Sequence, residues 1–225
     1  MTLTHPSPNF GERREGQRPE LVVIHYTAMP SAAAALERLC DPATEVSAHY
    51  LIDTDGTEVS LVAEDMRAWH AGAGAWGGRG DVNSRSIGIE LANRGAEPFA
   101  ERQMAALERL LADVLTRWGL PPQAVIGHSD MAPDRKGDPG MRFDWRRLAV
   151  QGLSVWPETV EANGPGDFFR EARHFGYPDA DADALLAAFR LRFRPWATGP
   201  LDETDAGLIA DLAHRFPVDA GAAQA

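Results

Sequence analysis

Short apolar runs alternate with helical patterns along residues 21–150, and this order limits the possible folds more than any other feature of the chain. The runs 21–27 (LVVIHYT), 84–93 (SRSIGIELAN) and 124–128 (AVIGH) contain β-branched residues and are too short for helices, so they predict strands. Two more apolar runs, within 47–62, meet at the turn sequence DTDG and predict a hairpin. Strands that alternate with helices are typical of an α/β domain.

Helical patterns and one long loop fill the intervals between these strands. Ser31 can cap a helix over 31–40, where alanines and leucines favour that structure. From 99 to 118 apolar residues recur every three or four positions, which predicts an amphipathic helix that ends at Gly119. Glycines dominate 68–83, so this segment predicts a loop, and its two tryptophans argue against disorder.

The composition changes near residue 157, which divides the chain. Residues 1–19 are read as a polar lead-in, 20–157 as the main domain, 164–217 as a small helical module and 218–225 as a disordered tail. Three helices are expected in the module, over 168–175, 182–193 and 203–216, with Asp181 and Asp202 as caps of the last two. A module of this size is near the lower limit for a free-standing core, so we expect it to pack on the main domain.

Net charge and cysteine content narrow the function classes. The chain carries 22 basic and 33 acidic residues, a net charge of −11, which argues against nucleic acid or an anionic membrane as a partner. Its one cysteine, Cys40, cannot form an internal disulfide. No run approaches the ~18 apolar residues of a membrane span, and the N-terminus lacks a leader pattern, so a cytoplasmic protein is expected. A leader already removed would leave no trace.

Three residues follow or end predicted strands in a way that suggests a metal site. His25 lies at the end of the first run, His128 ends AVIGH, and Asp138 follows in a loop rich in proline and glycine. Polar groups at strand ends line the crevice where α/β sheets bind ligands. Two imidazoles and a carboxylate are the ligand set of a catalytic zinc, with the fourth position open to water. The spacing is no local metal signature, however, so structural histidines remain an alternative at this point.

Two further residues fit hydrolytic chemistry beside such a metal. Glu90 is a carboxylate in an otherwise apolar strand and could shuttle a proton, although it could also pair with an arginine such as Arg85. Lys136 is the only lysine of the chain and lies two residues before Asp138. Its compact ammonium could stabilise an oxyanion, although a solvated surface lysine is the alternative.

The order of motifs resembles a known family. The blocks VVIHYTA, SAHYLID, AWHAG, SIGIEL and IGHSDMAPDRKGDPG are similar to those of zinc-dependent N-acetylmuramoyl-L-alanine amidases of the AmpD/AmiD type, which are related to phage lysozyme-amidases and peptidoglycan recognition proteins. The resemblance covers residues from about 20 to 150. It implies a mixed central β-sheet flanked by helices, with zinc on His25, His128 and Asp138, Glu90 as the catalytic glutamate and Lys136 as the transition-state lysine.

The same resemblance implies an activity and a substrate. The bond to be cleaved is the amide between the lactyl group of N-acetylmuramic acid, in its ordinary or 1,6-anhydro form, and L-alanine of the stem peptide, in peptidoglycan turnover or recycling. A muropeptide or peptidoglycan fragment is the implied partner, and the oligomeric state is left open. The module resembles a three-helix peptidoglycan-binding domain, with a packing role as the alternative. A non-catalytic peptidoglycan receptor and another zinc amidase or peptidase are the alternative functions.

Several residues in these blocks are candidates for substrate binding. The tryptophans could stack on sugar rings or only anchor their loop, and His49 could be a supporting core group. Stem-peptide carboxylates call for local arginines such as Arg79, Arg85 or Arg142. The predicted substrate contacts are His49, Trp69, His70, Trp76, Asn83 and Arg85.

Overall fold

A six-stranded mixed sheet forms the centre of the computed structural model, which describes residues 2–158 and 167–218. The strand order is β1-β5-β4-β7-β3-β8, in which β4 and β5 are antiparallel and the other neighbours are parallel. The strands are β1 (Thr2–Thr4), β3 (Leu21–Tyr26), β4 (Tyr50–Ile52), β5 (Glu58–Ser60), β7 (Ser86–Leu91) and β8 (Val125–Gly127). The α/β class and the mixed sheet are thereby confirmed.

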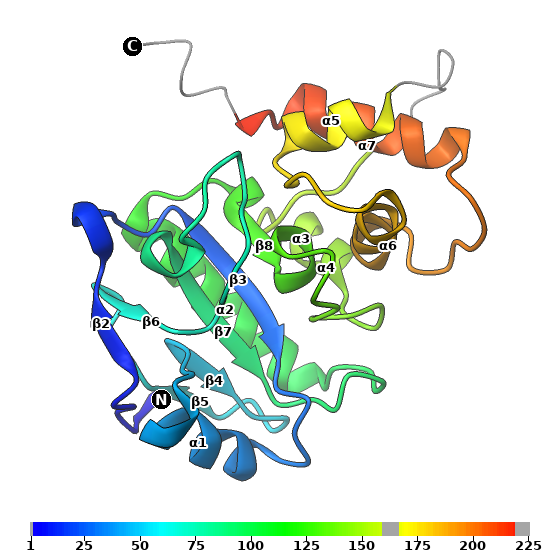
Figure 1. Cartoon of the computed structure of the whole chain (residues 1–225). Coiled ribbons are helices and arrows are strands. Elements are labelled where there is room, and N and C mark those ends of the chain that lie inside the picture. The colour runs from blue at the N-terminus through cyan, green and yellow to red at the C-terminus, as the bar shows by residue number, and fades with distance from the viewer. Residues whose placement is uncertain (1, 159–166, 219–225) are drawn as a thin grey trace.

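Helices flank this sheet (Figure 1). The α-helices are α1 (Ala32–Cys40), α2 (Glu101–Trp118), α3 (His128–Met131), α4 (Trp145–Val150), α5 (Phe168–Phe175), α6 (Ala182–Phe193) and α7 (Glu203–Arg215). The short 3-10 helices are η1 (Arg14–Gly16), η2 (Pro42–Thr44), η3 (Val82–Arg85) and η4 (Pro122–Ala124). The expected caps are present, because Ser31, Asp181 and Asp202 each accept a hydrogen bond from a backbone N–H in the first turn of their helix.

The two faces of the sheet have different roles. Ile87, Ile89 and Leu91 of β7 point to one face, where they share a core with Leu107 and Leu111 of α2. The residues that alternate with them, Ser86, Gly88 and Glu90, therefore point to the opposite face. That second face carries the polar groups of the site. Burial of the apolar face against α2 fixes the register, because a shift by one residue would exchange the two sets of side chains.

The lead-in is more ordered than the sequence suggested. β1 adds a strand at the edge of the main sheet beside β5, and β2 (Phe10–Glu12) pairs with β6 (Met66–Ala68) in a separate two-stranded sheet. Another correction concerns His128, which does not end a strand but begins the short helix α3.

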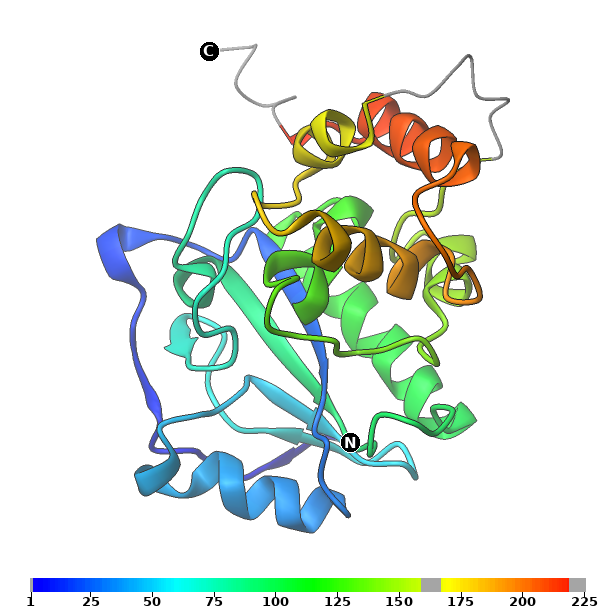
Figure 2. The same ribbon diagram turned by 45° about the vertical axis from the view of Figure 1, so that its right-hand side comes forward.

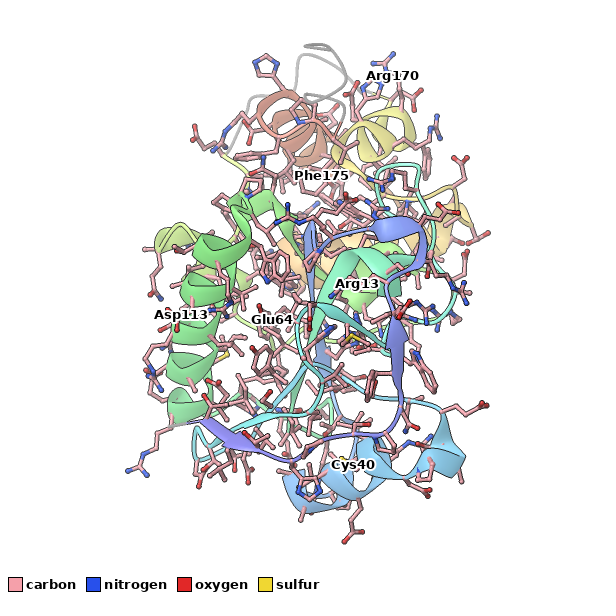
Figure 3. All side chains as sticks on the ribbon, turned by 90° about the vertical axis from the view of Figure 1, so that its left-hand side faces the viewer. Arg13, Cys40, Glu64, Asp113, Arg170 and Phe175 are labelled. Carbon is pink, nitrogen blue, oxygen red and sulfur yellow. The ribbon has the colours of Figure 1, made fainter. Side chains whose placement is uncertain are left out.

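The C-terminal helices pack on one end of the sheet (Figures 1 and 2). Phe175, Phe189 and Phe193 belong to the same core as Val23 of β3 and Ile126 of β8, so the two parts of the chain share one hydrophobic core. In Figure 3 Phe175 and Arg170 of α5 lie at the end of the molecule opposite Cys40, which is half-buried on α1. Most of the expected linker and tail, residues 159–166 and 219–225, lies outside the described residues.

A buried ion pair also joins the two parts. Arg192 of α6 donates to Asp130 of α3 at 2.7 Å, and the Tyr177 hydroxyl donates to the other oxygen of Asp130 at 2.8 Å. Arg192 also donates to the backbone carbonyl of Val125 at 2.9 Å, and its guanidinium lies 4.4 Å from the Trp145 ring centroid. Since α3 begins with His128, these contacts hold the segment on which that histidine lies.

Candidate active site and metal centre

Strand pairing places two of the predicted residues side by side. In the parallel register of β3 and β7, His25 lies opposite Glu90. Paired residues of neighbouring strands project to the same face, so both side chains point away from α2. The sequence favoured this placement because each residue alternates with apolar neighbours that enter the core.

His128 and Asp138 reach the same point from a different part of the chain. The Nδ1 atoms of His25 and His128 are 2.9 Å apart, and Asp138 Oδ2 lies 3.0 Å from each of them. All three residues are buried, with 2%, 3% and 8% of their surface exposed. The backbone holds Asp138 in place, since its carbonyl accepts the Ser129 N–H at 2.9 Å.

The donor set fits a metal ion. Among the described residues these three form the one cluster of His, Cys, Asp or Glu side chains suited to a metal. His128 Nε2 lies 2.9 Å from the carbonyl of Ala71, which can only accept, so Nε2 carries the proton and Nδ1 presents a lone pair. A tetrahedral zinc site with ~2.0–2.1 Å bonds separates its ligand atoms by roughly 3.3 Å, close to the spacing observed here.

The electrostatics of His25 and Asp138 favour cation binding at neutral pH. Burial and the neighbouring His128 lower the pKa of His25 to about 4, so the ring is neutral. Burial acts to raise the pKa of Asp138, but its contacts with His128 and His25 outweigh that effect and hold the pKa below the ordinary value. Neutral imidazoles and an ionised carboxylate are the forms in which these groups bind metals.

Glu90 lies next to this cluster and has an unusual environment. Its Oε2 atom is buried and has no hydrogen-bond partner among the described residues, while Arg85 pairs with Glu20 instead. Burial and the charge of Asp138 raise the pKa of Glu90 to about 8, against an opposing effect of Lys136. A carboxylate that exchanges protons near neutral pH is suited to general acid and base chemistry.

A cavity of about 420 Å³ opens onto these groups. Lys136 is exposed and lines it, as do Trp69, His70 and Glu90. The cavity therefore offers a cationic side chain beside the carboxylates, together with an aromatic ring at its wall.

The structure does not bring the other four predicted substrate contacts to this cavity. His49 and Arg85 are buried in the framework, with 0% and 4% exposure, and Trp76 packs against Phe175 and Tyr177. Asn83 accepts the N–H groups of His70 and Ala71, at 3.0 and 2.8 Å, and so shapes the loop. Polar side chains that support a site occur in the same motifs as those that form it, and the two differ in whether their donors and acceptors are used inside the framework.

Tyr26, Arg38 and Arg135 are among the cavity residues that the sequence did not predict. Tyr26 follows His25 directly, Arg38 projects from α1, and Arg135 precedes Lys136. Arg135 also donates to the Ala71 carbonyl at 2.8 Å, the same oxygen that contacts His128. The motif DRKGDPG contained the signal for Arg135, whereas nothing in the local sequence marked Arg38.

Comparison with known proteins gives a consistent picture. Residues 15–141 match the family model described as N-acetylmuramoyl-L-alanine amidase. The chain is 34% identical over 221 residues to the N-acetylmuramoyl-L-alanine amidase AmiD of Escherichia coli K12, covering 81% of this chain and 79% of AmiD. It is 36% identical over 165 residues to the 1,6-anhydro-N-acetylmuramyl-L-alanine amidase AmpD of the same strain, covering 64% and 88% of the two chains.

Solved structures agree over most of the chain. Escherichia coli AmiD, in complex with the substrate anhydro-N-acetylmuramic acid-L-Ala-D-gamma-Glu-L-Lys, superposes with a TM-score of 0.81 at 31% identity, covering 92% of this chain and 98% of that one. AmpDh3 from Pseudomonas aeruginosa, in complex with anhydromuramic pentapeptide, superposes with a TM-score of 0.80 at 31% identity, covering 91% and 94%. The likeness therefore includes the C-terminal helices as well as the sheet.

Proposed function

The chain belongs to the N-acetylmuramoyl-L-alanine amidase family, and we propose from this that it hydrolyses the amide between the lactyl group of N-acetylmuramic acid and L-alanine of the stem peptide. The substrate would be a soluble muropeptide released during peptidoglycan turnover. The anhydromuramyl peptides bound by AmiD and AmpDh3 support a 1,6-anhydro sugar as one accepted form.

The observation that carries the mechanism is the convergence of His25, His128 and Asp138 within 3.0 Å of one another beside Glu90. We assign the three as ligands of a zinc ion. When bound, zinc supplies Lewis acidity, which polarises a carbonyl and lowers the pKa of water toward 7. A receptor without catalysis is disfavoured because no member of the ligand set is missing.

The chain's own side chains would complete the reaction. Glu90, with its raised pKa, would accept the proton of the attacking water and transfer it to the leaving nitrogen of L-alanine. Lys136 would place its ammonium near the oxygen of the tetrahedral intermediate. Trp69 would pack on the sugar at the wall of the cavity.

Organisation and compartment follow as further parts of the proposal. Residues 20–157 would form the catalytic domain and 164–217 the small helical module. No helix in the described part of the chain is both long and apolar enough to cross a membrane. We propose action on recycled fragments in the cytoplasm, and fractionation of native cells, with the mature protein in the cytosolic fraction, is the corresponding test.

Mass spectrometry of defined muropeptides tests the activity. We expect the zinc-loaded protein to release an intact peptide with a free amino-terminal L-alanine from anhydro or non-anhydro substrate, and the chelator-treated protein to release none. The His25→Ala, His128→Ala double variant is the control and should lose both zinc and activity. Full zinc content in that variant, measured by elemental analysis, would contradict the assigned ligands.

A further inference from the structure

His70 lies behind one metal ligand, in a space that a glycine leaves free. Its Nδ1 atom is 3.0 Å from Nε2 of His25, on the side of that ring away from the metal-facing Nδ1. The His70 ring lies over Gly88 of β7, where any Cβ would overlap it. On its other side, His70 Nε2 is 3.1 Å from the hydroxyl of Ser86. The side chains of Ser86, His70 and His25 therefore form one hydrogen-bonded relay from the start of β7 to the metal site.

The direction of each hydrogen bond in this relay follows from a count of protons. The Ser86 hydroxyl lies 2.5 Å from the backbone carbonyl of Val82, which can only accept, so the single hydroxyl proton points to that carbonyl. Ser86 Oγ must then accept from His70, which places the His70 proton on Nε2. The Nδ1 atom of a neutral His70 is left as an acceptor.

The same count of protons determines the tautomer of His25. Because His70 Nδ1 accepts, the hydrogen bond between the two rings requires a proton on His25 Nε2. The Nδ1 atom of His25 then has a lone pair and no proton, and it faces His128 and Asp138. The backbone carbonyl of Val82, three hydrogen bonds away, thus determines which nitrogen of His25 is free to bind a metal.

We propose that His70 and Ser86 are positioning residues that hold His25 in the tautomer whose Nδ1 binds the metal. This proposal rests on the zinc site assigned above. His128 reaches the same tautomer by a different route, through a single hydrogen bond to the Ala71 carbonyl. His25 lies on β3, which is paired with β7 on one side and β8 on the other. It therefore uses a side-chain relay, whereas His128 uses a loop carbonyl. Outer hydrogen bonds of this kind orient metal-binding histidines.

The relay also gives His70 a role different from substrate contact. Both ring nitrogens are engaged, one with His25 and one with Ser86. A substrate hydrogen bond to either nitrogen would have to break one of the hydrogen bonds of the relay. Removal of the relay should therefore change metal affinity before it changes substrate affinity.

The test uses a pair of buried serines on the full-length protein. Ser86→Ala removes the acceptor for His70 Nε2, whereas Ser84→Ala removes an equally buried hydroxyl that contacts Arg67 and Asp81 instead. In metal-free protein labelled with ¹⁵N-histidine, long-range ¹H–¹⁵N spectra report which ring nitrogen carries the proton. His70→Gln identifies the His70 signals.

We expect wild type and Ser84→Ala to show His25 and His70 both protonated on Nε2, and Ser86→Ala to shift His70 toward the Nδ1-protonated form. The zinc dissociation constant of Ser86→Ala, measured by competition with a chelator, should rise about 10- to 100-fold, the usual effect of losing an outer hydrogen bond, with no change in Ser84→Ala. A wild-type His70 protonated on Nδ1, or an unchanged zinc affinity in Ser86→Ala, would overturn the relay. These readouts need no substrate, so a protein that shows the expected relay but leaves muropeptides intact would refute only the proposed function.

Discussion

Acidification should destabilise the protein through one buried histidine that the catalytic site does not use. His49 is fully buried and directly precedes β4. Its Nδ1 accepts the N–H of Gly88 at 2.9 Å, and its Nε2 donates to the carbonyl of Met66 at 3.1 Å. Both ring nitrogens are satisfied in the neutral form, so a second proton would have to displace the Gly88 N–H.

The magnitude follows from the pKa shift. Burial lowers the pKa of His49 from 6.5 to about 3, against a raising effect of the Met66 carbonyl. Between these two values the unfolded chain binds a proton that the folded chain does not, so stability is complete above pH 6.5 and is lost as the pH falls toward 3. At ~1.36 kcal/mol per pKa unit, the loss from His49 alone at pH 5 is about 2 kcal/mol.

Urea unfolding of metal-free protein at several pH values between 5 and 7.5 measures this loss. His49→Gln keeps a donor and an acceptor but cannot titrate, so its free energy of unfolding should fall less with acid than that of wild type. At pH 5 the two losses should differ by about 2 kcal/mol. His5→Gln removes an exposed histidine and should retain the full wild-type dependence. Parallel pH curves for wild type and His49→Gln would refute the reasoning.

Three substitutions test other parts of the account. Glu90→Gln should keep zinc, measured by elemental analysis, but lose ~10²- to 10⁴-fold in kcat, because a general acid and base is removed; near wild-type kcat would exclude that role. Lys136→Arg should lower kcat with nearly constant KM and unchanged metal content, since a planar guanidinium replaces a compact ammonium, and a wild-type kcat would reassign the oxyanion contact to the metal alone. Arg192→Met should lower the free energy of unfolding by ~3–5 kcal/mol, because Asp130 would remain buried without its cation, and a change below 1 kcal/mol in urea titrations would contradict that.

Much of the architecture was accessible from the sequence because local signals agreed with the global fold. The strand containing His25 and the amphipathic helix over 101–118 have the length, periodicity and end signals of their structures. β1 and β2 have none of these, since each spans three residues and exists only through pairing with β5 or β6. Such strands depend on contacts that no local pattern records.

The residues in and around the candidate site also divide into those that the local sequence marks and those that it does not. The residues assigned to the metal and to proton transfer were identifiable because their chemistry is rare at strand ends and in a loop of this kind. His49 and Asn83 have equally polar side chains, yet their donors and acceptors are used inside the framework. Asp130, which Arg192 and Tyr177 hold from a module distant in sequence, was not singled out because its partners come from that module.

Hydrolysis in H₂¹⁸O tests the central claim most directly, because it identifies the bond and the atom attacked. A defined muropeptide is turned over once by excess zinc-loaded protein, and the masses of both products are measured by mass spectrometry. We predict one ¹⁸O in the lactyl carboxylate of the muramic acid product and none in the peptide that begins with L-alanine. An ¹⁸O atom in a peptide fragment, or no cleavage by protein that holds a full complement of zinc, would contradict it.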